Sequence, residues 1–157
     1  MDLRPFQTKH LNALSPLVAE SQQEGFAFVQ RLEKEWREGS NRFDQPGEGY
    51  YGGWIDQQLI AIGGISQSPY HDDPRQGRIR RVYILPAFRG KGLGKRLIVH
   101  LLERHAPFFD DICLYTDQAK AAAFYEHLGF VRVRGPRKLS HRYMPDWISG
   151  KNPPPAP

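Results

Sequence analysis

The chain has 157 residues, of which 39% are hydrophobic and 25% are charged, a composition typical of a single globular domain. Its one cysteine, Cys113, excludes an internal disulfide framework and any metal site built from several cysteines. The formal net charge of +5 favours anionic partners, such as nucleic acids, phosphorylated cofactors or acidic metabolites.

No part of the sequence has the pattern of a membrane span or a secretion signal. The longest run of apolar residues and glycine, at 59–65, is far shorter than the roughly 20 residues that cross a bilayer. The first residues include an acid and no apolar stretch, so we expect a cytoplasmic protein without a signal peptide. We expect one folded domain over residues 1–148 and a disordered proline-rich tail at 149–157.

The first half of the chain predicts a strand, two helices and a β-hairpin. The second helix has the clearest pattern, because apolar residues from Phe26 to Trp36 recur at helical spacing and Gly39 follows as a stop. The expected ranges are a strand at 2–6, helices at 8–21 and 23–39, a loop at 41–49, and strands at 50–55 and 59–66.

The second half alternates strands and helices. A helix is expected to begin near Gly92, because Leu93, Leu97 and Leu101 recur at a spacing that makes one apolar stripe. The other expected elements are strands at 78–85, 112–116, 130–134 and 139–144 and a helix at 119–127. The order β-α-α-β-β-β-α-β-α-β-β predicts a single α/β or α+β fold with a partly antiparallel sheet.

The turn between the strand at 78–85 and the following helix is the most informative segment. Glycines at alternate positions let the backbone approach a ligand closely, and the first N–H groups of a helix bind anions. Solvated cations beside an ordinary turn are the simpler alternative, but the strand–turn–helix context favours a pyrophosphate site. The turn contains Arg89, Gly90, Lys91, Gly92, Leu93, Gly94 and Lys95.

Two common nucleotide motifs fit this turn poorly. The sequence Gly-x-x-x-x-Gly-Lys-Ser/Thr of a Walker A loop is absent. A dinucleotide-binding turn needs Gly-x-Gly-x-x-Gly and an acid at the end of the next strand, whereas Asp110 and Asp111 precede that strand here. Nucleic-acid binding also lacks support, because no helix-turn-helix spacing, zinc ligands or aromatic platform accompanies the basic residues.

The turn reads Arg-Gly-Lys-Gly-Leu-Gly at 89–94, and residues 118–130 read Gln-Ala-Lys-Ala-Ala-Ala-Phe-Tyr-Glu-His-Leu-Gly-Phe. The first segment matches the pattern Arg/Gln-x-x-Gly-x-Gly/Ala, and the second is similar to Asn-x-x-Ala-x-x-Phe-Tyr-x-x-x-Gly-Phe. In both motifs, and in the order of elements over most of its length, the chain resembles the GNAT superfamily of acyl-CoA-dependent N-acetyltransferases.

This resemblance implies an α/β (α+β) fold whose mixed, mostly antiparallel sheet of six to seven strands is flanked by about four helices. It also implies acetyl-CoA as a co-substrate and no metal. Strand backbone would pair with the pantetheine arm, and amides of the turn would hold the pyrophosphate. The implied cofactor-binding residues are Val82, Tyr83, Ile84, Arg89, Gly90, Lys91, Gly92, Leu93, Gly94, Lys95, Gln118 and Phe124. Gln118 stands where the family has asparagine.

Tyr125 matches the family tyrosine that protonates the leaving thiolate, a role that suits a phenol with a pKa near 10. The resemblance implies direct attack of a neutral amine on the thioester, with a strand N–H near Val82 stabilising the oxyanion. Cys113 could be a nucleophile in a covalent route, but its apolar strand and lack of a histidine partner favour an inert core residue.

The acceptor side is less defined by sequence. Family members often carry a glutamate where this chain has Arg78 or Cys113, so the general base is not identified. We expect Arg78 and Arg80 to share one strand face with Val82 and Ile84, which predicts an acceptor that bears a carboxylate or another anion. Candidate bases are Glu48, Asp72, Asp73 and His141, and candidate substrate-binding residues are Glu48, Arg78, Arg80 and His141.

We therefore expect an enzyme that acetylates a primary amine of a small molecule or peptide. The missing carboxylate keeps an alternative open, a catalytically silent module that binds or senses acyl-CoA. We expect no nucleic-acid or membrane partner, and a monomer or a homodimer.

Overall fold

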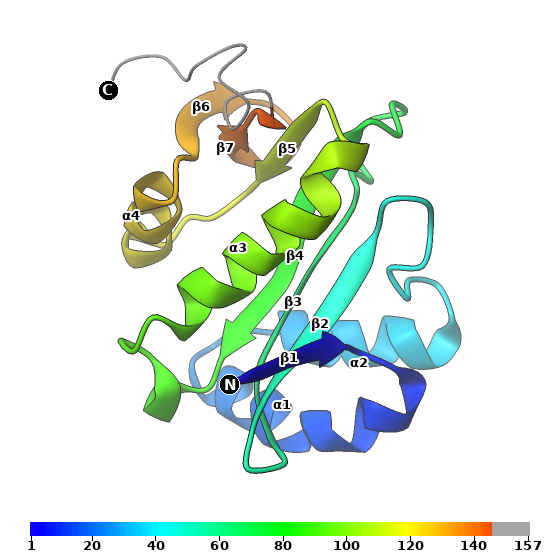
Figure 1. The fold of residues 1–157 in the computed structure, drawn as a ribbon, viewed down its shortest axis with the longest axis vertical. Helices are drawn as coiled ribbons and strands as arrows, with labels where there is room; N and C mark the ends of the chain where they lie inside the picture. The colour runs from blue at the N-terminus through cyan, green and yellow to red at the C-terminus, as the bar shows by residue number, and fades with distance from the viewer. Residues whose placement is uncertain (146–157) are drawn as a thin grey trace.

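The computed structural model describes residues 1–145. The tail expected at 149–157 and the end of the expected domain lie outside that range. Seven strands form one sheet in the order β1-β2-β3-β4-β5-β7-β6 (Figure 1). The strands are β1 (Asp2–Pro5), β2 (Gly49–Ile55), β3 (Gln58–Gln67), β4 (Gln76–Ile84), β5 (Asp111–Leu114), β6 (Val131–Gly135) and β7 (Leu139–Tyr143). The helices are α1 (Ser15–Gln23), α2 (Phe28–Glu38), α3 (Leu93–His105) and α4 (Ala119–His127).

The sheet is antiparallel except between β4 and β5, which are parallel. These two strands pair only where Gln76, Gly77 and Arg78 of β4 face β5, and they separate beyond that point. This arrangement confirms the predicted mixed, mostly antiparallel sheet with its flanking helices. It also leaves the second half of β4 without a neighbour from β5.

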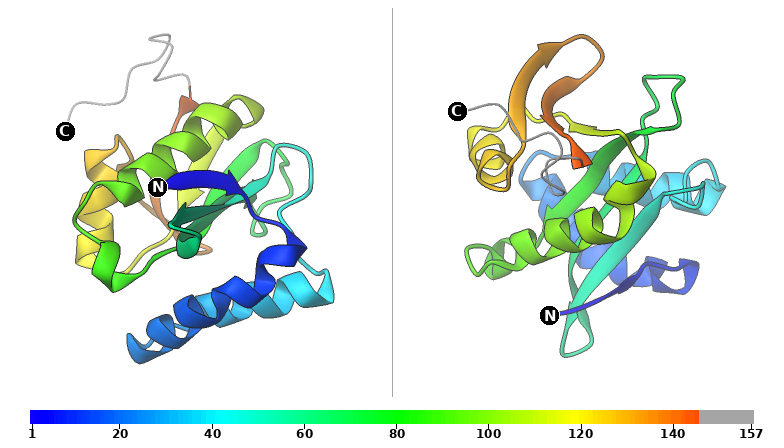
Figure 2. Two further views of the ribbon diagram at one scale, coloured as in Figure 1. Left: turned by 60° about the horizontal axis from the view of Figure 1, so that its bottom comes forward. Right: turned by 45° about the horizontal axis from the view of Figure 1, so that its top comes forward.

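Helices cover both faces of the sheet and divide the core in two (Figure 2). Helices α1 and α2 pack on one face, where Leu17, Leu32 and Trp36 join a buried cluster with β2, β3 and β4. Helices α3 and α4 pack on the other face, where Leu97 and Tyr125 join a second cluster with the sheet. The faces are called the α2 face and the α3 face below.

The first predicted helix was wrong in one respect. Residues 8–21 do not form one helix; a 3-10 helix over Thr8–Leu14 precedes α1. Pro16 lies in the first turn of α1, where its missing N–H costs nothing, but a proline inside a longer helix would break the hydrogen-bond ladder.

The second predicted helix begins later than expected. A turn at Gly25, whose φ is 84°, separates α1 from α2, so the helix starts at Phe28 instead of residue 23. It ends at Gly39 in the left-handed conformation, as predicted. The other predicted elements lie within two residues of the observed ones, apart from short 3-10 turns at Pro86–Phe88 and Ala106–Phe108. Within residues 1–145, every helix is too short or too polar to cross a membrane.

Candidate functional site

The free edge of β4 is the first component of the site. After Arg78, the strand continues through Ile84 with β3 on one side and no β5 residue on the other. Backbone N–H and C=O groups along such an edge are available to a ligand that offers complementary groups. Val82, Tyr83 and Ile84, the predicted pantetheine-binding residues, lie on this segment. The Ile84 carbonyl already accepts a hydrogen bond from Arg89 Nε at 2.8 Å.

A β-bulge at Arg81 changes the predicted arrangement of side chains on β4. Its φ is 55°, and the β3–β4 register shifts by one residue at this point. The expectation that Arg78 and Arg80 share a face with Val82 was therefore wrong, while Ile84 packs against the buried cluster of the α2 face. Val82 packs on the α3 face beside Leu97, whereas the two arginines lie on the α2 face.

The glycine turn after β4 has a geometry that suits an anion at the start of α3. Gly90 and Gly92 adopt φ values of 77° and 78°, and a Cβ atom added to either would meet nothing within 4 Å. The first helical bond runs from the Arg96 N–H to the Gly92 carbonyl at 3.2 Å. The amides of the preceding turn, from Leu93 to Lys95, therefore have no partner inside the helix. Open space beside free amides suits a phosphate group.

Gly94 has a packing function within the same turn. A Cβ atom here would lie 3.0 Å from Ile84 Cδ1 and 3.3 Å from Phe124 Cζ. The absence of a side chain thus lets the start of α3 approach both β4 and α4. Phe124, predicted to contact the cofactor, lies directly beside this close approach.

Arg89 is held by an acid that the sequence motifs did not indicate. Glu24, at the end of α1, receives two hydrogen bonds from the Arg89 guanidinium, at 2.6 and 2.9 Å. The Tyr83 hydroxyl donates to the same carboxylate, and its ring lies 5.2 Å from the guanidinium carbon. The hydrogen bond from Arg89 lowers the pKa of Glu24. Lys91 and Lys95 remain exposed beside the turn.

Tyr125 lies on α4 within the core of the α3 face. Its side chain is 8% exposed and packs edge-on against Phe124 and Phe130. Burial raises the pKa of Tyr125 well above its usual value, so the phenol stays protonated at neutral pH. Gln118 precedes α4, is exposed, and donates from its amide to the Asp117 carboxylate at 3.1 Å.

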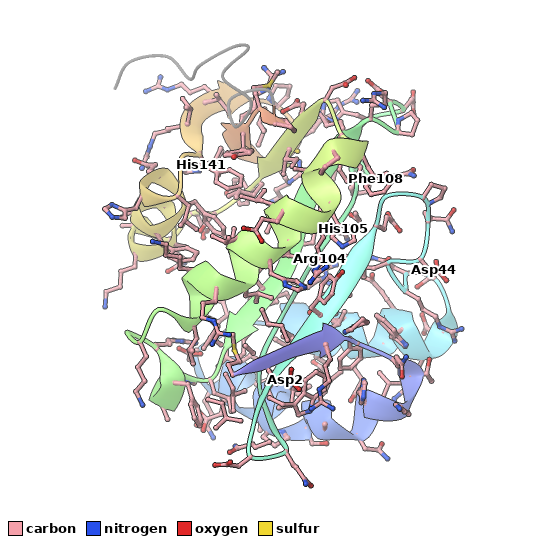
Figure 3. The ribbon with its side chains drawn as sticks, viewed as in Figure 1. Asp2, Asp44, Arg104, His105, Phe108 and His141 are labelled. Atoms are coloured by element: carbon pink, nitrogen blue, oxygen red, sulfur yellow. The ribbon has the colours of Figure 1, made fainter. Side chains whose placement is uncertain are left out.

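His141 lies on β7 (Figure 3) and forms hydrogen bonds at both ring nitrogens. The side chain is 1% exposed, with Nε2 at 2.8 Å from the exposed Glu126 and Nδ1 at 2.9 Å from the Ser140 hydroxyl. Because a carboxylate only accepts, Nε2 donates to Glu126. Glu126 also accepts from Arg132 at 2.9 Å. Sequence reasoning missed this pair, because Glu126 and His141 meet only when α4 packs on the sheet.

The predicted carboxylate candidates do not gather around Tyr125. Glu48 accepts hydrogen bonds from the backbone N–H groups of Gln45 and Gln67, at 3.0 and 2.8 Å, and so closes the loop before β2. Asp72 and Asp73 lie in the exposed loop between β3 and β4. Cys113 is fully buried, its thiol contacts a backbone carbonyl, and burial raises its pKa.

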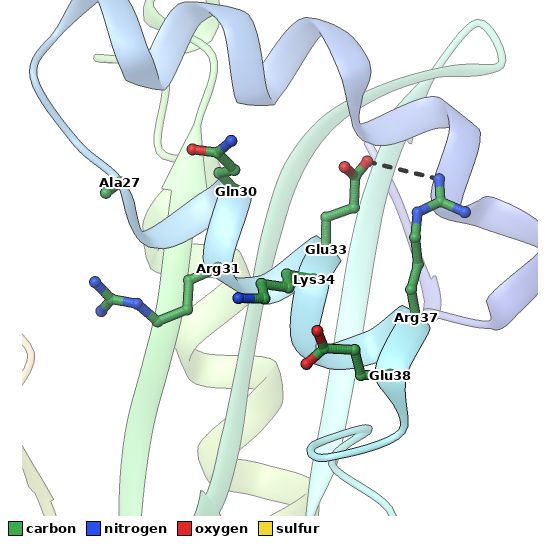
Figure 4. Close-up of a pocket in the computed structure, with 7 residues that line it drawn as sticks. All are labelled: Ala27, Gln30, Arg31, Glu33, Lys34, Arg37 and Glu38. Carbon is green, nitrogen blue, oxygen red and sulfur yellow. Dashed lines mark ion pairs between the residues drawn. The ribbon is translucent and has the colours of Figure 1, made fainter.

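Two surface hollows lie away from the β4 edge. One, of about 650 Å³, is lined entirely from Ala27 and the exposed side of α2, where Arg37 and Glu33 form an ion pair at 3.8 Å (Figure 4). The other, of about 450 Å³, lies near the start of β2 and includes Glu48 and His105. Within the described part of the chain, no group of three or more histidines, cysteines and acids is placed to hold a metal ion.

A model of the acetyltransferase (GNAT) family matches residues 13–130 of the chain. The matched range contains the β4 edge, the glycine turn and α4. Among curated proteins, the chain is 31% identical over 94 residues to YjgM of Escherichia coli strain K12, described as an uncharacterized N-acetyltransferase. That alignment covers 58% of this chain and 56% of YjgM, so the chain spans about half the length of this relative.

Solved structures share the whole fold. A proposed acetyltransferase from Exiguobacterium sp. 255-15 is 32% identical, with a TM-score of 0.81 over 97% of this chain and 99% of that chain. The PaiA N-acetyltransferase from Thermoplasma acidophilum, solved in complex with coenzyme A, is 15% identical. Its TM-score is 0.63 over 91% of this chain and 98% of that chain, a likeness of fold alone.

Proposed function

Because the chain belongs to the acetyltransferase (GNAT) family, we propose that it transfers an acetyl group from acetyl-CoA to a primary amine of a small molecule or peptide. The acceptor attacks directly within a ternary complex, without an acylated enzyme. The observation that carries the proposal is the open edge of β4 beyond Arg78, which runs directly into the anion site at the start of α3.

The residues present fit coenzyme A. The amides from Leu93 to Lys95 and the open space at Gly90 and Gly92 suit the diphosphate, with Lys91 and Lys95 adding positive charge. The backbone of Val82 and its neighbours on the β4 edge suits the amide groups of the pantetheine arm. When bound, acetyl-CoA supplies an acyl carbon activated by its thioester.

Tyr125 is the proposed general acid. The neutral amine nitrogen bonds to the acetyl carbon, the carbon–sulfur bond breaks, and the Tyr125 hydroxyl donates its proton to the departing sulfur. The acylated nitrogen releases one proton, which passes to water or back to the Tyr125 phenolate. Burial raises the pKa of Tyr125, which keeps the phenol protonated before the reaction and also makes it a weaker acid. Its place on α4, beside Phe124 and the Gly94 contact, brings it to the same end of the sheet as the glycine turn.

The experiment combines binding with turnover. Calorimetry with coenzyme A and acetyl-CoA measures affinity, and a thiol-release assay with a panel of amines measures transfer. We expect binding and release of thiol with at least one amine. Binding without release from any amine would favour a silent acyl-CoA-binding module, and no heat with either ligand would contradict both functions.

Tyr125→Phe tests the acid. We expect kcat to fall at least about tenfold, the size typical of a lost proton transfer, with little change in the affinity for coenzyme A. The control is Tyr51→Phe, which removes another buried tyrosine hydroxyl, bonded to His105 at 2.8 Å and located on β2, with β3 between it and β4. If Tyr125→Phe keeps the wild-type kcat, Tyr125 is not the acid.

A further inference from the structure

We propose that the amine acceptor carries a carboxylate or a comparable anionic group, bound by Arg80 on the α2 face of β4 with Arg78 behind it. The inference rests on the proposed function and names the class of acceptor. It depends on a group of cations that the fold gathers where β4 and β5 separate and that have no ion pair in the described part of the chain.

Arg80 is a partly buried cation that forms no ion pair within residues 1–145. Its one hydrogen bond in the described structure, to the Ser66 hydroxyl, is long at 3.4 Å, and its guanidinium lies 5.9 Å from the Phe43 ring. Burial and the charge of Arg81 lower the pKa of Arg80, and Arg78 acts in the same direction, whereas Glu35 and Tyr70 act in the opposite one. A charge taken from water without a partner costs free energy, which an anionic ligand would offset.

Arg78 adds a second unbalanced charge two residues earlier on the same strand face. It is 3% exposed, and its nitrogens donate to the backbone carbonyls of Lys138 and Arg137, at 2.7 and 3.5 Å. Its guanidinium also lies 4.8 Å from the Tyr70 ring, while Nε has no partner. The backbone carbonyls and the tyrosine ring accept from the Arg78 guanidinium, but neither carries a negative charge that would balance it.

The nearby acids are already engaged elsewhere. Arg81 forms an ion pair with Glu35 of α2 at 3.0 Å, so this carboxylate already has a partner. Lys138, from the turn between β6 and β7, lies 4.8 Å from the ring of the exposed Tyr115 just after β5. Three cations that form no ion pair within residues 1–145, Arg78, Arg80 and Lys138, thus come from β4 and the β6–β7 turn, where the Lys138 carbonyl accepts from Arg78.

This region lies at the reacting end of the β4 edge. The last β4–β5 pair joins Arg78 to Cys113, and Arg80 follows where the strands have parted. A positive potential here attracts an anionic acceptor and repels a polyamine. It also lowers the pKa of an acceptor ammonium, which increases the fraction of neutral amine without a carboxylate base.

The test compares each L-amino acid with its own carboxamide, which lacks the negative charge and has a more acidic ammonium group, so each kcat/KM is expressed per concentration of neutral amine. We expect wild-type kcat/KM for the best acid to exceed that of its amide by about tenfold or more, the contribution of a charge-assisted hydrogen bond. In Arg80→Gln, KM for the acid should rise by a similar factor, while the amide, which loses only the effect of the charge on its amine pKa, should lose much less. Arg31→Gln, the same change on the exposed side of α2, serves as the control.

A second readout needs no turnover. The same amino acids should raise the Tm of the wild-type protein and fail to raise that of Arg80→Gln. Without ligand, the Tm of Arg80→Gln should not be lower than that of the wild type. Faster transfer to spermidine or to the amides, or an equal loss for acid and amide in Arg80→Gln, would overturn the proposal. If no amine releases thiol, the proposed function fails, and the Tm shifts alone then decide whether the anion site exists.

Discussion

Gly90 and Gly92 turn the chain through the left-handed region just before α3, and no side chain fills the space beside them. An L-residue with a Cβ atom is strained at such φ values. The glycines therefore serve two needs at one point, because they permit the turn and they keep the helix amides uncovered. Gly94 differs, since its missing Cβ makes room for Ile84 and Phe124.

Gly92→Ala should weaken the binding of coenzyme A. The substitution strains a residue with φ of 78° and displaces the amides that follow it, at a cost of about 1 kcal/mol in stability. Gly39→Ala is a matched control, with the same φ at the end of α2 and only ordinary contacts for the added Cβ. We expect both variants to lose similar Tm and only Gly92→Ala to lose affinity in calorimetry. If Gly92→Ala and Gly39→Ala bind coenzyme A with equal affinity, the glycine turn is not part of the binding site.

At the scale of elements, the ion pair of Glu24 and Arg89 joins the end of α1 to the turn before α3. The two side chains are 27% and 43% exposed, so solvent screens much of their attraction. The bidentate geometry and the Tyr83 hydroxyl nevertheless connect three elements: α1, β4 and the glycine turn.

Glu24→Gln should lower Tm by about 2–4 °C, which corresponds to the roughly 1 kcal/mol expected of such a pair in a chain of this length. A double-mutant cycle with Arg89→Gln measures the coupling directly. We expect the double variant to be more stable than the sum of the single losses predicts. Strict additivity would show that the two residues do not interact in solution.

Local patterns predicted the elements that depend on neighbouring residues. The helix from Leu93, the stop at Gly39 and the bounds of α4 all follow from spacing and glycine positions within a few residues. The bulge at Arg81 did not follow, because it depends on how β3 and β4 align. The contact of Glu24 with Arg89 joins residues distant in sequence, which no local pattern can reveal.

The sheet as a whole is two antiparallel groups of strands joined through a short parallel pairing, with a helical layer on each face (Figure 2). Burial favours the neutral form of three histidines by lowering the pKa of His10, His100 and His105. His105 Nδ1 donates to the Gly47 carbonyl at 3.0 Å, a bond that acts in the opposite direction, and in the neutral ring Nε2 accepts from the Tyr51 hydroxyl.

Global stability should therefore decrease as the pH falls below about 6.5, the pKa of an unfolded histidine. The unfolded chain binds more protons than the folded one in this range, so stability rises with pH through the window. We expect Tm to fall between pH 7.5 and 5.5, and His105→Asn to show a shallower fall. His127→Asn, a change at an exposed histidine, serves as the control. If the Tm of His105→Asn falls with pH as steeply as that of the wild type, His105 does not contribute to the pH dependence of stability.

The separation of β4 from β5 affects how the protein without bound ligand interacts with other chains. An uncovered strand edge is a template on which stray extended chains can add, and folded proteins normally shield such edges. Under the proposed function this edge cannot be covered permanently, since a built-in strand would occupy the place of the co-substrate. Bound coenzyme A would then cover the β4 edge, and we expect the free protein to aggregate more readily than the coenzyme A complex.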